Sequence, residues 1–217
     1  MKTTIKDKDI REPLCEYLEE RFGKCRIFEE KRMGKSRADM VMVLTDEVWG
    51  IEIKSDADTY TRLSRQVKDY DAFFDRNVIV VGSSHGQHVA EHVPEDWGII
   101  TVEETEDGLD FYEMREAKPN PKAKLPFKLS ILWRPELAHI QERYDMHAYA
   151  RQSKKFVQDK ILALVPEEEL HREISEELFE RDYEKIAEQI DAYRLEHGQR
   201  KKRRTVRNKR KYKAPKQ

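Results

Sequence analysis

The chain has 217 residues, of which 38% are hydrophobic and 39% are charged, so it can bury a core beneath a strongly ionic surface. Its net charge of −1 hides an asymmetry, because eleven basic and no acidic residues lie in residues 199–217, which leaves 31 basic and 43 acidic residues elsewhere. Two cysteines exclude a disulfide framework, and no run is apolar enough for a signal or membrane span. We therefore expect a cytoplasmic protein with no membrane partner.

Composition divides the chain into four parts. We expect an α/β domain over residues 1–117, a linker over residues 118–128 that holds three prolines, a helical region over residues 129–198, and a basic disordered tail over residues 199–217. A basic arm on an acidic body suggests binding to nucleic-acid phosphates, although charge runs are more often merely solvated. The candidate contacts are Arg200, Lys201, Lys202, Arg203, Arg204 and Arg207.

The first elements in chain order are a helix and a short strand. Residues 7–22 place Ile10, Leu14 and Leu18 at helical spacing, while Pro13, which is best tolerated in a first turn, favours a start near Arg11. Residues 25–30 predict a strand that leads into a hairpin.

Residues 37–54 form the centre of the pattern. Two apolar runs, 40–44 and 48–53, flank the polar residues 45–47, which predicts a β-hairpin. If the hairpin pairs symmetrically, residues whose numbers sum to 91 lie opposite each other, so Asp39 faces Glu52 and Lys54 lies on the same face. A slip of one residue would separate the two carboxylates. The alternative is that these charges only solvate the ends of the strands.

The hairpin is followed by alternating helix and strand signals. Residues 60–75 predict a helix that buries Leu63, Val67, Tyr70 and Phe74. Gln66 shares that face, either as a core amide bonded to the backbone or as a group that reaches the carboxylates. The strands expected next span residues 77–82, 97–102 and 109–114, the last of them at an edge.

The remaining pattern is helical. Helices are expected over residues 131–144, 153–165 and 170–194, most simply as a small bundle, with a DNA-reading or partner-docking unit as the alternative. His85, His88 and His92 lack an ordered Cys or acidic partner, so we interpret them as surface histidines and not as a zinc site.

Facing carboxylates beside a lysine suit phosphodiester hydrolysis. Asp39 and Glu52 can supply oxygen ligands to Mg²⁺ or Mn²⁺, and the carbonyl of Ile53 can add a third. Such an ion activates water and neutralises charge on the reacting phosphate. Lys54 could orient or deprotonate the water or stabilise developing charge, and Gln66 could position the water or the phosphate.

These residues resemble the PD-(D/E)XK nuclease superfamily: Asp39, then Glu52-Ile53-Lys54, then a helix with Gln66 and Tyr70. The stretch EIKSDADTYTRLSRQVKDY is similar to a group of bacterial and phage proteins that share EIKSD-x-DT-x-x-RL-x-x-Q-x-x-x-Y, and more distantly to Holliday-junction resolvases and virus-type replication-repair (VRR-NUC) nucleases. The likeness extends over residues 7–102 and into ILWRPEL at residues 131–137. Ala38 stands where the superfamily name has proline.

The resemblance implies a restriction-endonuclease-like mixed sheet flanked by helices, with a helical C-terminal appendage. It implies a Mg²⁺- or Mn²⁺-dependent deoxyribonuclease that acts on DNA in repair, restriction or phage DNA processing. The alternative is a non-catalytic nucleic-acid-binding or scaffold protein with the same fold. Homodimers are common in this superfamily, so a homodimer is compatible with the resemblance.

The superfamily often has one more acidic ligand, from the first helix or the first strand. Glu12 and Glu16 fit the former position, and Glu29 and Glu30 fit the latter. We favour Glu30, because its strand should lie beside Asp39.

Overall fold

The structure is a computed structural model that describes residues 6–55, 58–83, 86 and 88–196. The chain divides into two compact units, Met1–Arg181 and Asp182–Gln217, and each is described by itself. The basic residues predicted to bind nucleic acid, from Arg200 to Arg207, lie outside the described residues.

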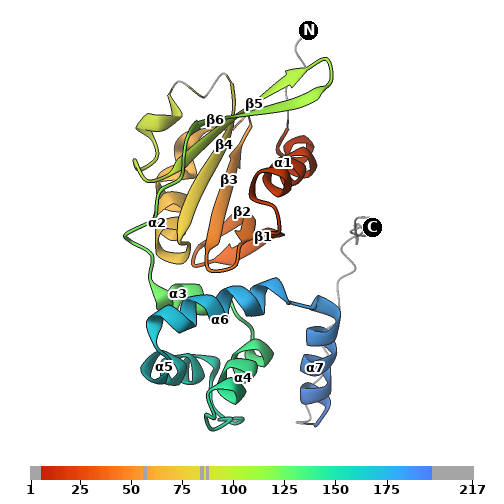
Figure 1. Ribbon diagram of the computed structural model, residues 1–217, viewed down its shortest axis with the longest axis vertical. Helices are drawn as coiled ribbons and strands as arrows, with labels where there is room; N and C mark the ends of the chain where they lie inside the picture. Colours follow the sequence, from red (N-terminus) through yellow and green to blue (C-terminus); the bar gives the residue numbers. More distant parts are fainter. Residues whose placement is uncertain (1–5, 56–57, 84–85, 87, 197–217) are drawn as a thin grey trace. The chain divides into compact units, whose positions relative to one another are not determined.

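A six-stranded mixed sheet forms the centre of the first unit (Figure 1). Its strands follow chain order, with the two hairpin ladders β1–β2 and β2–β3 antiparallel, β3, β4 and β5 parallel, and β6 antiparallel at the far edge. The mixed α/β fold with a helical C-terminal region is confirmed. The bounds are β1 Arg26–Met33, β2 Ser36–Val43, β3 Val48–Lys54, β4 Arg76–Gly82, β5 Gly98–Thr105 and β6 Gly108–Arg115.

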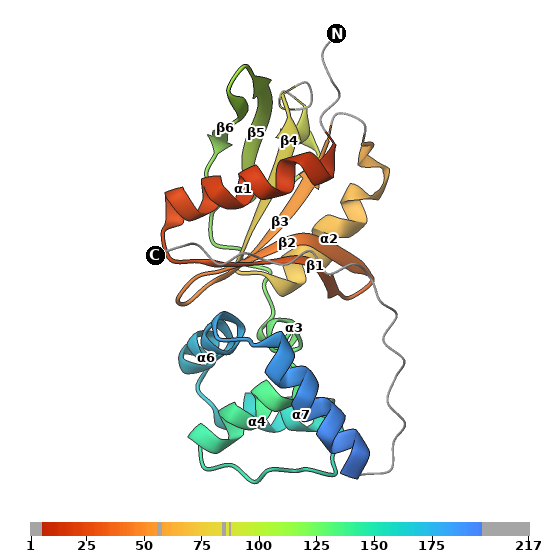
Figure 2. The ribbon, with the colours of Figure 1, turned by 90° about the vertical axis from the view of Figure 1, so that its right-hand side faces the viewer.

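The helix α1, Asp7–Phe22, covers one face of the sheet (Figures 1 and 2). Ile10, Leu14 and Leu18 are buried against apolar side chains of β2, β3 and β4. The helix expected over residues 7–22 is confirmed, whereas the later start near Arg11 that Pro13 suggested is wrong, because the helix begins at Asp7 and contains Pro13. Proline removes one backbone hydrogen bond there, and the buried apolar stripe continues past it on both sides.

The opposite face is covered by a short 3₁₀ turn, Tyr60–Arg62, and by α2, Leu63–Phe73 (Figure 2). Tyr70 and Phe74 are fully buried there against Val41 and Val43 of β2. The alternation expected for the apolar run of the hairpin is therefore confirmed, with Val41 and Val43 facing α2 and with Met40 and Met42 in the core cluster of α1. A second 3₁₀ turn, Val89–Glu91, lies between β4 and β5.

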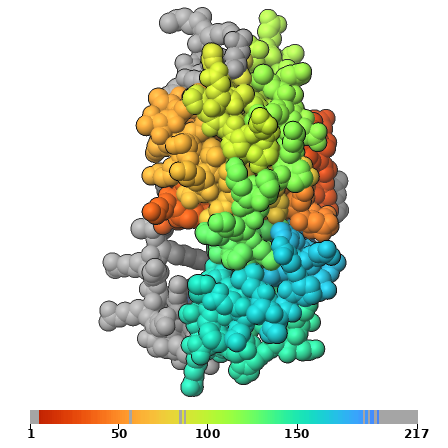
Figure 3. Space-filling view, turned by 90° about the vertical axis from the view of Figure 1, so that its left-hand side faces the viewer, coloured from red at the N-terminus to blue at the C-terminus, as the bar shows by residue number. Residues whose placement is uncertain are grey.

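The helices after the sheet are α3 Leu125–Leu129, α4 Arg134–Arg143, α5 Lys154–Leu164 and α6 Glu167–Phe179. Their buried side chains, among them Leu137, Ile161 and Ile174, join the same core cluster as the α2 face of the sheet. In Figure 3 the green segment before α3 lies between the orange α2 and the cyan helices, and the three adjoin one another on this face. Sheet and helical region are thus packed through one continuous core.

The segment predicted as a linker is hydrogen-bonded to α2. Asn120 Nδ2 donates to the carbonyls of Asp71 and Phe74 at 2.9 and 2.7 Å, and the amide of Lys124 donates to Ala72 at 3.1 Å. These bonds satisfy carbonyls at the end of α2, and α3 begins directly afterwards at Leu125.

The long helix expected over residues 170–194 is wrong, because the chain breaks between α6 and α7, Tyr183–Glu196. Arg181 in the break is buried and bonded to Glu136, which takes its backbone out of a helical path. Asp182 Oδ1 accepts from the amides of Glu184 and Lys185 at 2.9 and 3.0 Å, a cap that begins α7. Among the described helices, none has the length and hydropathy to cross a membrane.

Candidate metal centre

The β2–β3 register has the symmetry expected from the sequence. Met40 lies opposite Ile51 and Val43 opposite Val48. The backbone pairing of the two strands ends at Met40 and Ile51. The next amide of β3 on this side, that of Ile53, donates to the side chain of Asp39 instead, with a distance of 3.0 Å to Oδ2. Asp39 and Glu52 therefore lie at adjoining positions of two strands, as expected.

Glu52 is fully buried, and both of its carboxylate oxygens have partners. Lys54 Nζ and Gln66 Nε2 donate to Oε1, while the hydroxyl of Tyr70 lies 2.7 Å from Oε2. The structure thus brings together Glu52, Lys54 and Gln66 as expected, and Gln66 reaches the carboxylate instead of bonding to the backbone.

Asp39 has weaker partners. Its Oδ1 lies 3.5 Å from Arg11 Nη2, its carbonyl accepts from Arg11 Nη1 at 3.0 Å, and its amide lies 3.3 Å from the hydroxyl of Tyr70. The Asp39 side chain is 16% exposed, so Oδ1 is the carboxylate oxygen of this pair that is best placed to accept a further ligand.

Burial, followed by the neighbouring charge of Glu52, raises the pKa of Asp39 to about 7. The amide of Ile53 and the ammonium of Lys54 lower the pKa but do not offset the first two effects. Burial also raises the pKa of Tyr70, so its hydroxyl stays a neutral donor. A carboxyl held in this way gains most from a nearby cation.

The donor atoms present fit a hard divalent ion. Two carboxylates are of the type that Mg²⁺ and Mn²⁺ bind, and the carbonyl of Ile53 points to the same side of β3 as its amide, toward Asp39. Gln66 Oε1 is buried without a hydrogen-bond partner among the described residues, which leaves an acceptor beside the pair. The described part of the chain contains no group of three His, Cys, Asp or Glu side chains in metal-binding proximity.

The four glutamates considered for a third ligand occupy different places. Glu30 has a φ of 54° in an irregular part of β1, and its carboxylate lies 3.2 Å from Arg37. Glu12 and Glu16 are exposed on α1. Glu29 shares a partner with Asp39, since it lies 3.5 Å from Arg11 Nη1. The role of Glu30 stays a prediction, and the geometry places Glu29 closer to the pair's hydrogen-bond network.

Two contributors to the centre were not among the predicted site residues. Arg11, held by Asp7 at 2.7 Å, reaches Asp39 from α1, and no sequence pattern links these positions. Tyr70 was expected as a core residue, but its hydroxyl joins Ile51, Glu52 and Asp39. Its place on the α2 face with Gln66, one helical turn away, was the signal in the sequence.

Comparison with known proteins gives one family and one distant structure. The solved structure of Pyrococcus furiosus SfsA in complex with Ca²⁺ is 15% identical with a TM-score of 0.32, and the similarity covers 54% of this chain and 63% of that one, less than two thirds of its length. No curated protein matches. The family model described as bacteriophage P4 protein cII matches residues 1–201, so the chain belongs to the bacteriophage P4 protein cII family.

Proposed function

We propose that this protein is a nuclease that depends on a divalent metal and hydrolyses phosphodiester bonds of DNA. The observation that carries the proposal is the convergence of Asp39, Glu52 and Lys54 at the β2–β3 ladder, with Gln66 of α2 against the same carboxylate. The phage protein that gives the family its description favours phage DNA processing over the other roles expected from the sequence.

Asp39, Glu52 and the carbonyl of Ile53 would hold Mg²⁺ or Mn²⁺. Such an ion, when bound, supplies Lewis acidity and an activated water. Asp39 offers the more available oxygen, since Glu52 is bonded to Lys54, Gln66 and Tyr70. Tyr70 and the amide of Ile53 orient the two carboxylates.

Lys54 and Gln66 act on the substrate side of the centre. The ammonium of Lys54 can stabilise negative charge that develops on the phosphate. Gln66 keeps its Nε2 on Glu52, so its Oε1, buried without a partner among the described residues, can accept a hydrogen bond from the attacking water. Both side chains are held in place by contacts with a buried carboxylate.

The test is cleavage of labelled DNA, as duplex, single strand and branched forms, with Mg²⁺ and with Mn²⁺. Asp39→Asn and Glu52→Gln should each lower turnover by about 10²-fold or more, as removal of a group that stabilises the transition state does. Glu104→Gln, an exposed carboxylate of β5, is the matched control and should cleave normally.

Lys54→Met separates catalysis from metal binding. It should keep the metal-induced rise in melting temperature but lose turnover, while Gln66→Ala should cause a milder loss of rate. If wild type binds DNA but cleaves none of the forms with either ion, the protein is a binding or scaffold protein. Near-normal activity in both carboxylate variants would show that the site is misassigned.

A further inference from the structure

A second group of charged side chains lies in the first unit, beside the half-buried ring of Trp133. It consists of Lys31 on β1, Arg181 after α6, Glu136 on α4, and Lys154 in the first turn of α5. Lys154 and Arg181 donate to consecutive carbonyls, those of Ser130 and Ile131. Lys31 Nζ lies 5.5 Å and the Arg181 guanidinium 4.9 Å from the centroid of the Trp133 ring. We call this group the Trp133 cluster.

The Trp133 cluster contains three cations and one anion. Arg181 and Glu136 form a buried pair, with Nε–Oε1 and Nη2–Oε2 distances of 2.5 and 2.7 Å. Lys154 Nζ donates to the carbonyl of Ser130 at 2.8 Å, a neutral partner. Within the described residues, no carboxylate lies within ion-pair distance of Lys31 or Lys154. The cluster therefore has two positive charges in excess.

Burial and the excess positive charge together lower the pKa values of the two lysines. Burial, together with repulsion by Arg181 and Lys154, lowers the pKa of Lys31 to about 8 against the attraction of Glu136. The pKa of Lys154 is also lowered, first by burial. The arrangement differs from that of Lys128, a buried lysine whose Nζ lies 2.5 Å from Asp75. Lys128 thus has a carboxylate within ion-pair distance, whereas Lys31 has none among the residues that the structure describes.

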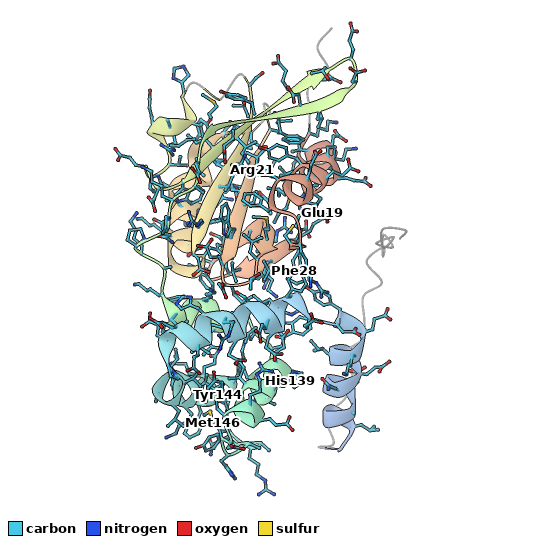
Figure 4. All side chains as sticks on the ribbon, in the orientation of Figure 1. Glu19, Arg21, Phe28, His139, Tyr144 and Met146 are labelled. Atoms are coloured by element: carbon cyan, nitrogen blue, oxygen red, sulfur yellow. The ribbon has the colours of Figure 1, made fainter. Side chains whose placement is uncertain are left out.

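Half-buried cations without counter-ions cost free energy, which an incoming anion recovers. Two ammonium groups can together neutralise the charge of a phosphate. Phe28, labelled in Figure 4, also lines this region, with the Arg181 guanidinium 5.7 Å from its ring. Lys31 lies opposite Ala38 in the β1–β2 ladder, and Ala38 precedes Asp39.

We propose that the Trp133 cluster binds a backbone phosphate of nucleic acid through the ammonium groups of Lys31 and Lys154. The inference rests on the proposed function for the kind of ligand. It adds a second contact with the nucleic-acid strand whose phosphodiester bond Asp39 and Glu52 would help to cleave.

The test compares neighbouring residues of the full chain. Lys31→Gln is matched by Arg32→Gln, its exposed neighbour on β1, and Lys154→Gln by Lys155→Gln on α5, whose Lys155 is 80% exposed. Binding of a labelled oligonucleotide is measured by fluorescence anisotropy in EDTA over a range of salt concentrations. Each cluster variant should weaken binding several-fold, and the two substitutions combined should lower the slope of log K against log [salt] by about 0.7–0.9, the contribution of one phosphate, while their controls should do neither. Equal effects in variant and control would overturn the proposal.

A stability measurement keeps the proposal testable without DNA. Inorganic phosphate, at constant ionic strength against chloride, should raise the melting temperature of wild type more than that of Lys31→Gln. Without phosphate, Lys31→Gln should be at least as stable as wild type, because a half-buried charge is removed. A large drop in stability that Lys154→Gln repeats would mean that the lysines are structural. Phosphate stabilisation with unchanged oligonucleotide affinity would mean a small phosphate ligand and would also overturn the proposal.

The two proposals fail separately. If wild type cleaves no DNA but the cluster variants still bind it more weakly than their controls, the nuclease is wrong and the phosphate site stands. If Asp39→Asn abolishes cleavage while both cluster variants bind DNA normally, the nuclease stands and the phosphate site is wrong.

Discussion

At the scale of single residues, Asp39 and Glu52 share a register but have different surroundings. Glu52 is buried with three side-chain donors, whereas Asp39 depends on the Ile53 amide and a 3.5 Å contact with Arg11. Burial near a second carboxylate raises the pKa of Asp39 to about 7. The negative charge of Asp39 therefore costs the fold free energy when no metal is bound.

This predicts a pH dependence of the metal-free stability. The folded-state pKa of Asp39 is raised above its ordinary value, so its contribution is complete below about pH 4 and is lost as the pH rises to about 7. Between pH 5 and 8 the contribution should fall by about 2–3 kcal/mol, and Asp39→Asn should remove that part of the slope. Urea unfolding in EDTA at a series of pH values measures it.

Added Mg²⁺ or Mn²⁺ should stabilise wild type more at pH 8 than at pH 5.5, because the ion binds the ionised carboxylate. Equal pH slopes for wild type and Asp39→Asn in EDTA would contradict the assignment of this carboxyl.

At the scale of elements, the close packing of α2 against β3 depends on the missing side chain of Gly50. A Cβ at this position would lie 2.6 Å from Cδ1 of Tyr70 and would also collide with the ring of Phe74. The absence of a side chain lets α2 approach β3 closely enough for the Tyr70 hydroxyl to reach Ile51 at 3.0 Å and Glu52 at 2.7 Å. Gly50 thus positions a group of the candidate centre through packing.

Gly50→Ala should lower the free energy of unfolding by about 1–3 kcal/mol, as overpacking of a core does. It should also lower the cleavage rate, because Tyr70 and Gln66 move with α2. Tyr70→Phe is the comparison, since it removes the hydroxyl and leaves the packing in place. Thermal unfolding and cleavage assays would check both, and a Gly50→Ala protein with wild-type stability would contradict the packing argument.

At the scale of the whole first unit, the sheet and the helical region are joined by a buried polar contact. Lys128 of α3 lies 2.5 Å from Asp75, whose Oδ2 also accepts from the amide of Val48 at 2.7 Å, and His171 of α6 lies 3.0 Å from Lys128 Nζ. Burial alone would raise the pKa of Asp75, but hydrogen bonding from His171 and the charge of Lys128 outweigh it and lower the pKa.

Lys128→Met should therefore destabilise the unit by about 3–5 kcal/mol, because it leaves a buried carboxylate without its cation. Lys122→Met is the matched control: Lys122 lies 2.9 Å from Asp71 but is 55% exposed, so its removal should cost less than about 1 kcal/mol. Since the pKa of Asp75 is lowered, the stabilisation is present above its ordinary pKa and is lost as the pH falls through the folded-state value. Equal effects of the two substitutions in urea unfolding would contradict this account.

The basic tail belongs to the same scale, although it lies outside the described residues. Its eleven cations are attached to a body with 31 basic and 43 acidic residues, which repels DNA. Truncation after residue 197 should leave the melting temperature nearly unchanged and weaken DNA binding. It should also lower the salt slope by roughly 0.9 for each duplex phosphate that the tail neutralises. Turnover at saturating DNA should persist. Unchanged affinity and salt slope would show that the tail has another partner.

The sequence by itself determined the features that depend on local periodicity. The alternation of residues 40–44 and 48–53 around a short polar turn specified the hairpin register, and with it the meeting of Asp39 and Glu52. The helical spacing that placed Gln66 beside Tyr70 carried it to the same face as Glu52. Side-chain direction along a strand or a helix follows from position alone, so such pairs can be read without the tertiary structure.

Only the tertiary structure decided which distant segments meet. Arg11 reaches Asp39 from α1, Arg181 ends a run of helical sequence because it is buried against Glu136, and Lys31 adjoins Trp133 from a strand about a hundred residues earlier. Each of these contacts depends on how the helices pack on the sheet. The spacing of charged residues along the sequence does not show which distant residue a charged side chain will contact. The candidate metal-binding residues of the hairpin can therefore be predicted from local residue spacing, whereas the charged groups around them are brought there by the packing of distant segments.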